Sequence, residues 1–481
     1  MKPVRFLLAP AVALVVVAAC TTTPRTDPRM VSEWMHTLYG VVRAERISPP
    51  LASRLIGYAS VALYEGLSAA TPTLPSMAGT LNGLAELPRG APGERYDATL
   101  VAVEAERVVL DSMLGEALPT TQAALARLVD SLRNTRTAAG IKEAVRDRSE
   151  ELGRRIADAI VAWSRTDGFD STRRMAAYVA PKGPGLWFND APSPIYTTQN
   201  LSGATQFVAL DNPNNMLRGT SASDRGLILN RPKNEGLAYL PPVKMTGTTE
   251  PYWSTIRPFL LKSWDECALD PPPVFDTTPG SALYQDARNI YDMKQQLTED
   301  QKMTALYWAD NAGETATPSG HWTAIAAQMV SQQQLSAEDA ARLFVLTSIS
   351  TADAFIAGWG YKYKFSLLRP RTYIRAHIDP EWEPLIPTPP FPAYPSGHSA
   401  LSAAAATVAT ALLGNVPFED STELSIGHPV RRFPTFDSAA MEAGASRLYG
   451  GIHFQIDNLG GQALGRCIGK LVVERPAAAA Q

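Results

Sequence analysis

The sequence predicts an all-α protein. Six segments space their apolar residues at i, i+3 and i+4, which is the pattern of helices with one buried face. These segments are 30–71, 95–165, 298–311, 336–365, 398–414 and 453–474. Two helix starts carry capping-box residues, Thr298 with Gln301 and Ser336 with Asp339. Sustained alternation of apolar and polar residues, which would indicate strands, is absent from the sequence, as is a repeat of fixed period.

The N-terminus has the pattern of an export sequence. Two basic residues precede the apolar stretch Phe6–Val17, which has the length of a signal peptide. Small residues then lead to Cys20 (Val17-Ala18-Ala19-Cys20), in a pattern that resembles a bacterial lipobox. We expect residues 1–19 to be a signal peptide, Cys20 to carry lipid and residues 20–27 to form a polar tether. A plain cleaved signal peptide is the alternative. Either way we expect export, and in the lipidated form anchoring to a bacterial envelope membrane, facing the periplasm.

The rest of the chain is long enough for one or two domains. Net charge is −3 and no Lys/Arg-rich run occurs, which argues against nucleic acid as a partner. Residues 168–260 are rich in Pro, Gly, Asn and Thr, and we expect this irregular segment to wrap around the helices or cover the site. The Pro271–Pro273 run predicts a boundary between an N-terminal helical region, 28–273, and a catalytic region, 274–475.

Two cysteines remain after Cys20. Cys267 and Cys467 have no metal-ligand spacing, so they form either one disulfide or two buried thiols.

Three short segments near the C-terminus combine groups that bind a tetrahedral oxyanion. They read K-x6-RP from Lys362 to Arg369-Pro370, PSGH over 395–398, and SR-x5-H-x3-D from Ser446 to Asp457. Together they supply three cations, two histidines, a hydroxyl and a glycine amide. Each alone is a common turn or surface sequence, but their ordered occurrence predicts one site for phosphate or vanadate.

The cations and amides would surround the anion, and we call this set of groups the cage. Arg369 and Arg447 can donate bidentate hydrogen bonds to anion oxygens, whereas Lys362 acts as a point charge. Ser396 and Gly397 precede an Ala-rich helical run, so we expect their amides at a helix N-terminus. Gly397 also allows the backbone to approach a ligand closely.

The two histidines would carry the chemistry. His453 and Asp457 are four residues apart and would share one helix face. Asp457 could therefore fix the tautomer of His453 and leave its other nitrogen free for phosphorus or vanadium. His398 is then the expected general acid/base.

A second PSGH occurs at Pro318–His321. We interpret it as unrelated to the site, because it precedes Lys362 and no SR-x5-H-x3-D follows it at a comparable distance. We expect His321 at the surface, in a satisfied core position or at the entrance to the site. The acidic pair Glu419-Asp420 is expected in a solvated face or turn.

The ordered triplet resembles that of the type 2 phosphatidic acid phosphatase (PAP2) and vanadium-dependent haloperoxidase superfamily, over residues 353–470. The resemblance implies a C-terminal four-helix bundle around the site. It implies that His453 is the axial vanadium ligand of a peroxidase or the phosphorylated nucleophile of a phosphatase, with His398 the acid/base in both. The residues that would bind the oxyanion's oxygens are Lys362, Arg369, Ser396, Gly397 and Arg447.

Further residues favour the soluble bacterial haloperoxidase-like branch. The run TPPFPAYP at 388–395 resembles the approach to the motif in vanadium chloroperoxidases, and Trp359 matches an aromatic of their halide pocket. Phe391 lies where chloroperoxidases have Phe and many bromoperoxidases have His. Core packing is an equally good interpretation of both aromatics. Asp310 resembles an aspartate that pairs with a cage arginine or with the acid/base histidine.

We therefore expect a vanadate-dependent haloperoxidase that oxidises halide with hydrogen peroxide to hypohalous acid, with Lys362 polarising the bound peroxide. An organic acceptor would then be halogenated. A phosphomonoesterase is the alternative, with a phosphate ester as substrate, His453 as nucleophile and no cofactor. A non-catalytic lipoprotein that binds the oxyanion is a third hypothesis.

Overall fold

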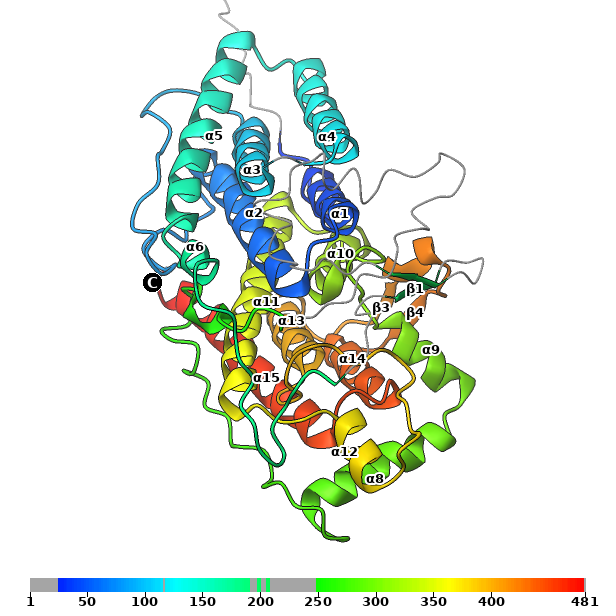
Figure 1. Cartoon of the computed structure of the whole chain (residues 1–481). Coiled ribbons are helices and arrows are strands. Elements are labelled where there is room, and N and C mark those ends of the chain that lie inside the picture. The colour runs from blue at the N-terminus through cyan, green and yellow to red at the C-terminus, as the bar shows by residue number, and fades with distance from the viewer. Residues whose placement is uncertain (1–24, 116, 191–196, 200–204, 208–247, 480–481) are drawn as a thin grey trace, which may run out of the picture.

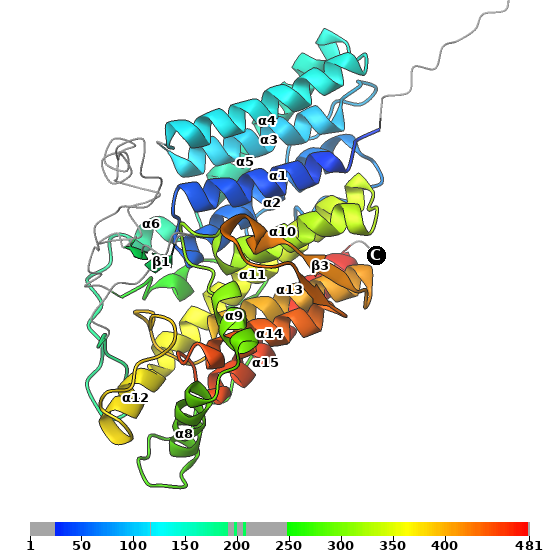
Figure 2. The same cartoon turned by 90° about the vertical axis from the view of Figure 1, so that its right-hand side faces the viewer.

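The computed structural model describes residues 25–115, 117–190, 197–199, 205–207 and 248–479. Helices form nearly all of the regular structure in these ranges, which confirms the predicted all-α class. The predicted signal peptide and Cys20 lie outside the described residues. Figures 1 and 2 show helices stacked in layers from the N-terminal to the C-terminal part of the chain.

The N-terminal layers consist of five long helices. These are α1 (Arg29–Ala44), α2 (Pro49–Ala70), α3 (Ala98–Leu114), α4 (Pro119–Ala138) and α5 (Glu143–Ser164). α2 is central among them, because it packs on α3 and α5 and is buried from Pro50 to Ser68. A short helix, α6 (Phe169–Thr172), follows.

A long central helix, α11 (Ala337–Phe365), connects the N-terminal layers to the C-terminal bundle. It packs on α2 at one side and on α13 (Gly397–Leu413) at the other, and it begins at the predicted Ser336 cap. Its length and hydropathy would suffice to cross a membrane, but 94% of its apolar window is buried inside the protein. α11 is therefore a core helix, joined by α10 (Thr317–Gln332), which packs against α1 and α2.

The C-terminal bundle consists of α11, α13, α14 (Phe436–Tyr449) and α15 (Gln455–Ala479). α13 and α15 approach closely because alanines of α13 face glycines of α15. A Cβ on Gly465 would lie 2.1 Å from the Ala400 carbonyl oxygen, and one on Gly461 would lie 2.5 Å from that of Ser396. This contact fixes the start of α13, where the PSGH motif lies, against the start of α15.

Smaller elements close the molecule around this bundle. Helices α8 (Ala282–Gln295) and α12 (Pro370–His377) pack together at one end, and α9 (Glu299–Tyr307) packs on α14. β3 (Phe418–Asp420) pairs antiparallel with β4 (Arg431–Phe433), and the connection between the two strands contains the 3-10 helix η4 (Thr422–Ile426).

Parts of the predicted irregular segment 168–260 fall within the described residues. They include the antiparallel strands β1 (Thr197–Gln199) and β2 (Thr205–Phe207) and the 3-10 helix η3 (Trp253–Thr255). The amides of Phe259, Leu260 and Leu261 donate to the Asp353 carboxylate in α11, so this end of the segment lies against the helical core. The remainder, 191–196, 200–204 and 208–247, lies outside the described residues. The boundary at Pro271–Pro273 stays a prediction.

Cys267 and Cys467 form a disulfide, which resolves the choice that the sequence left open. The two residues are 200 positions apart, so the bond links the segment before α8 to α15. Closing so long a loop restricts the unfolded chain strongly.

Replacing both cysteines with serine should lower the free energy of unfolding by about 2–5 kcal/mol. Calorimetry without reductant should therefore give a lower Tm for the double variant than for the wild type. Reductant should lower the wild-type Tm towards that of the variant and leave the variant unchanged. A wild-type Tm that does not respond to reductant would contradict this expectation.

Candidate functional site

The three predicted motif segments converge at the N-terminal end of α13. Lys362 lies in the last turn of α11, Arg369 precedes α12, and Ser396 is the N-cap of α13. Arg447 lies in the last turn of α14 and Asp457 in the first turn of α15. All five are almost completely buried, although four of them are ionisable.

His453 has one protonated and one bare ring nitrogen in this arrangement. Its Nδ1 lies 2.9 Å from Asp457 Oδ2, and its Nε2 lies 3.1 Å from Arg369 Nη1. Because a carboxylate accepts and a guanidinium donates, Nδ1 carries the proton and Nε2 presents a lone pair. Burial, with repulsion from Arg369 and Lys362, lowers the pKa of His453 well below its ordinary value, so the ring is neutral. A neutral imidazole can ligate a metal or attack phosphorus once its lone pair is released from Arg369 Nη1.

One nitrogen of the Arg369 guanidinium makes no hydrogen bond within the described part of the chain. Its Nε donates to the Phe391 carbonyl at 2.8 Å, and its Nη1 donates to the Ile452 carbonyl at 2.8 Å. Its buried Nη2 has no hydrogen-bond partner among the described residues. A buried unpaired guanidinium nitrogen is costly, and an anion oxygen would satisfy it.

Arg447 and Asp310 compete for the same nitrogen of His398. Arg447 Nη1 lies 3.4 Å from His398 Nε2, and Asp310 Oδ2 lies 3.5 Å from it. Arginine can donate to this nitrogen only when the ring is deprotonated there, whereas the carboxylate favours a proton on it. Burial and the Arg447 charge lower the pKa of His398 to about 4, and Asp310 opposes that shift.

Lys362 directs its ammonium towards the backbone rather than into the cage. Nζ donates to the carbonyls of Pro392, Ala393 and Pro395 at 3.0, 2.8 and 2.5 Å. An ammonium has three protons, so a direct contact with an anion requires one carbonyl to be exchanged. Burial and repulsion from Arg369 lower the pKa of Lys362 well below its ordinary value. Lys362 thus also fixes the loop that leads into PSGH.

The start of α13 contributes a glycine amide. Gly397 is the first residue of the helix, so its N–H has no acceptor within the helix. Gly397 lines a pocket, and an added Cβ would extend there to 3.5 Å from the Trp359 ring. The predicted use of the Ser396 amide is wrong, because that N–H donates to the Asp457 carbonyl at 2.9 Å. Its hydroxyl caps the helix and accepts from Ser399.

Taken together, these residues fit a tetrahedral oxyanion. Burial lowers the pKa of Arg369 to about 9 and that of Arg447 to about 10, so both gain from an added negative charge. The unpaired Arg369 Nη2, the helix start at Gly397 and the bare nitrogen of His453 supply donors for oxygens and a ligand for the central atom.

The cage opens into a pocket that encloses about 700 Å³, part of it open to solvent. Its wall combines His398, Arg447 and His453 with apolar side chains. The apolar lining includes Pro49, Phe355, Trp359, Ile386, Pro387, Pro389, Phe391 and Ile452. Pro49, at the start of α2, comes from the N-terminal layers.

Trp359 and Phe391 both line this pocket, as predicted for a halide site, and both also pack in the core. Their ring centroids are 5.0 Å apart, and the Trp359 N–H donates to the Thr249 carbonyl at 3.1 Å. Phe391 lies between two cations, with Lys362 Nζ at 5.2 Å and Arg369 Cζ at 4.9 Å from its centroid. The two side chains therefore present apolar ring surface to the pocket and no free hydrogen-bond donor.

Sequence reasoning missed the cluster behind His398. His321 is fully buried, so neither a surface nor an entrance position is correct for it. Its Nδ1 lies 2.9 Å from Asp310 Oδ1, and its Nε2 lies 2.9 Å from Asp420 Oδ2. Asp420 is therefore not in a solvated turn as predicted, but buried at the end of β3. The duplicated PSGH was the available signal, since it places His321 in the first turns of α10.

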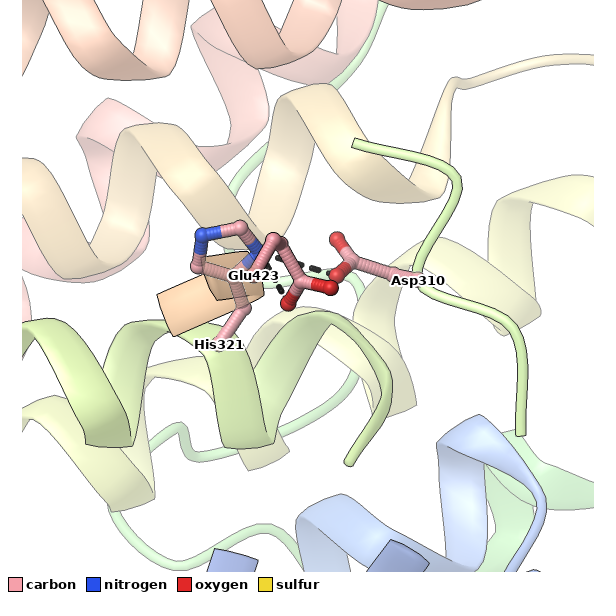
Figure 3. A group of neighbouring side chains, drawn as sticks. All are labelled: Asp310, His321 and Glu423. Carbon is pink, nitrogen blue, oxygen red and sulfur yellow. Dashed lines mark hydrogen bonds and ion pairs between the residues drawn. The ribbon is translucent and has the colours of Figure 1, made fainter. Parts of the chain in front are cut away.

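Asp310, His321 and Glu423 converge in this cluster, as Figure 3 shows. Their ligand atoms lie within 4.8 Å of one another, a spacing that a metal ion could bridge. Both ring nitrogens of His321 already lie at hydrogen-bond distance from carboxylates, however. A doubly protonated ring accounts for that arrangement without a metal. Asp310 connects this cluster to the anion cage.

Replacing Asp457 with asparagine should weaken vanadate binding about 10–100-fold. The variant loses the negative charge that fixes the His453 tautomer and supports its basicity. Equilibrium dialysis followed by vanadium analysis would measure the change. Asp286→Asn is a matched control, since Asp286 accepts from the Gln455 and Ile456 amides at the same helix start. Equal losses in the two variants would contradict the assigned role of Asp457.

Comparison with known proteins agrees with this geometry. Residues 342–481 match the VCPO second helical-bundle domain. A bacterial vanadium-dependent iodoperoxidase structure superposes with a TM-score of 0.75 at 30% sequence identity, covering 94% of this chain and 98% of that chain. Holo-type bacterial vanadium-dependent chloroperoxidase superposes with a TM-score of 0.58 at 17% identity, covering 95% of this chain and 94% of that chain, which supports the fold. Among curated protein sequences, none matches significantly. The helical fold, the matched bundle and the full-length similarity at 30% identity place the chain in the vanadium-dependent haloperoxidase family.

Proposed function

We propose that the chain is a vanadate-dependent haloperoxidase that oxidises halide with hydrogen peroxide to hypohalous acid, which then halogenates an organic acceptor. The observation that carries the proposal is the unprotonated Nε2 of His453, which lines the pocket and lies 3.1 Å from Arg369 Nη1, together with the unpaired Nη2 of that arginine. The family relationship supports the same reading.

The residues of the cage divide the binding between them. Arg369, Arg447 and the Gly397 amide would hold the oxygens, and His453 would hold the central atom. Vanadate at this position supplies a Lewis-acidic centre that activates peroxide towards halide without changing its own oxidation state. Asp457 would keep the His453 lone pair aimed at it.

His398 would move the proton. In the neutral ring, Nε2 accepts from Arg447, and after protonation the same atom can donate to Asp310. The two neighbours therefore stabilise the two protonation states in turn, which suits a general acid/base. Lys362 would contribute positive charge, and it would polarise bound peroxide directly after releasing one of its carbonyl acceptors.

We propose iodide as the halide oxidised most readily, followed by bromide. Iodide is the easiest of the halides to oxidise, and the pocket adds the apolar rings of Trp359 and Phe391 to the hydrogen-bond donors of Arg447 and His398. The similarity to an iodoperoxidase supports this order.

Reconstitution separates the enzyme hypotheses. The purified protein would be assayed with vanadate, peroxide and iodide, bromide or chloride, and separately for hydrolysis of an aryl phosphate without vanadate. Halide oxidation that requires vanadate supports the proposal. Phosphate hydrolysis that vanadate inhibits, without any halide oxidation, would favour the phosphomonoesterase and overturn it. Anion binding without either activity would favour the binding lipoprotein.

We also propose export with a lipid anchor on Cys20, facing the periplasm. The Cys267–Cys467 disulfide supports an oxidising compartment. Fractionation of the wild type and Cys20→Ser should place the wild type in the membrane fraction and the variant in the soluble fraction. Recovery of both in the soluble fraction would point to a plain cleaved signal peptide.

A further inference from the structure

His321 is enclosed by acidic groups on both edges of its ring. Asp310 lies at Nδ1 and Asp420 at Nε2, each at 2.9 Å, and Glu423 Oε1 lies 3.8 Å from Nδ1. A neutral imidazole has one N–H and one lone pair, so one of its edges would oppose a carboxylate lone pair. Only the imidazolium donates to both carboxylates.

The faces of the ring are equally enclosed. Trp308 stacks on His321 with centroids 4.3 Å apart and planes 14° from parallel, and Tyr307 meets it at a steep angle. A flat cation on an indole face is favourable where water is excluded. His321 is fully buried, so the cation is held by these partners and not by solvent.

We propose that His321 is a permanently charged positioning residue that keeps the Asp310 carboxylate ionised and aimed at His398. The inference rests on the proposed function in assigning proton transfer to His398. It extends that function by giving the buried cluster a role in the protonation of His398.

The ionisation of Asp310 depends on the charged His321 ring more than the ionisation of Asp420 does. Asp310 Oδ1 faces His321 and Oδ2 faces His398, and Oδ2 makes no close hydrogen bond within the described residues. Asp420 Oδ1 instead accepts from the Thr422 amide and hydroxyl, at 3.0 and 2.6 Å, and from Gln328. Without His321, Asp310 is therefore the carboxylate that takes up a proton.

Burial and the neighbouring charges determine in which direction the pKa of His398 changes when the charge of His321 is lost. Although burial opposes it, Asp310 and Asp420 raise the pKa of His321 well above its ordinary value, and burial raises the pKa of Glu423 to about 8. The charged groups that face His398 are then Asp310, Arg447 and, behind Asp310, His321. Once Asp310 is protonated, His398 loses its only anionic neighbour among these, so its pKa falls.

The charge of His321 can be measured in the anion-free protein. The chain has six histidines, so ¹⁵N-histidine labelling gives a countable spectrum. We expect both nitrogens of His321 to carry protons at pH 8.5, where an ordinary histidine is neutral. Asp420→Asn keeps the ring and its stacking but removes one carboxylate, so it identifies the His321 signal and should convert it to a neutral tautomer at that pH. A wild-type spectrum without any imidazolium at pH 8.5 overturns the proposal, whether or not the protein oxidises halide.

Kinetics test whether His321 acts through Asp310. In the vanadate-loaded enzyme, His321→Gln and Asp310→Asn should each move the acid limb of kcat/KM to lower pH by about 1–3 units. The double variant should move it no further than either single one, because both remove the same carboxylate charge. His377→Gln is the matched control, since its ring packs against Phe275 and Tyr373 and not against this cluster.

Different outcomes would show that His321 has only a structural role or that the proposed function is wrong. A lower rate at every pH, without a shift of the acid limb of the kcat/KM profile, would show that His321 only supports folding. A shift in the double variant equal to the sum of the two single shifts would show that His321 does not act through Asp310. Loss of all halide oxidation in the wild type would refute the proposed function and leave the NMR result standing.

Discussion

Replacing His398 with alanine is expected to reduce kcat/KM for peroxide-dependent iodide oxidation by about 10²–10⁴-fold. One ring nitrogen of His398, Nε2, lies near both the Arg447 guanidinium and the Asp310 carboxylate. Arg447 can donate to it when it is unprotonated, and Asp310 can accept from it when it is protonated. Removing it leaves Arg447 and Asp310 to pair with each other and leaves no group at this point that changes protonation near the working pH. Initial rates across pH 4–8, at saturating vanadate, would measure the effect.

The retained functions of this variant are as informative as the loss. Vanadate affinity should stay within a few-fold of the wild type, because the groups assigned to the oxygens and the central atom are untouched. His428→Ala serves as a histidine control outside the site, since its ring contacts Met303. A His398→Ala enzyme that keeps its full rate would exclude the acid/base role while leaving the cage intact.

Replacing His453 with alanine is expected to abolish both stable vanadate binding and halide oxidation. The variant removes the lone pair that faces the cage, so the loss of affinity should exceed the ~10–100-fold expected for its supporting carboxylate. It also leaves Asp457 as a buried carboxylate without the Nδ1–H that it accepts. Vanadium analysis after dialysis measures the first effect, and the iodide assay measures the second.

Added imidazole offers a specific control for this variant. The truncated side chain leaves a space beside Arg369 Nη1 and Asp457 Oδ2, both of which would orient a free imidazole as they orient the His453 ring. Partial recovery of vanadate binding with imidazole, and none with a similarly sized neutral solute, is expected. A His453→Ala protein that retains vanadium and activity would show that the central atom is held elsewhere.

The fold class and the cage could be predicted because both rest on local sequence. Helical spacing and caps are short-range patterns, and the Ser336 cap indeed begins α11. The His453–Asp457 contact follows from a four-residue spacing, and the structure brings the two side chains to 2.9 Å. The convergence of Lys362, Arg369 and Arg447 required only that their segments share one site.

Other features depend on contacts that no local pattern contains. His321 obtains its two carboxylates from positions 11 residues before it and 99 residues after it, so its surroundings could not be read from its own segment. The Ser396 amide is used by a carbonyl of a different helix, which a helix-start argument does not foresee. The disulfide likewise joins residues 200 positions apart.

The position of Pro49 has a consequence for how such proteins can be recombined. The chemically active groups all come from the C-terminal half, yet the first residue of α2 forms part of the pocket wall. Under the proposed function, the choice of organic acceptor would therefore depend on both halves of the chain. A chimera that exchanges the N-terminal layers with those of a relative would inherit the catalytic residues unaltered and still select among acceptors differently.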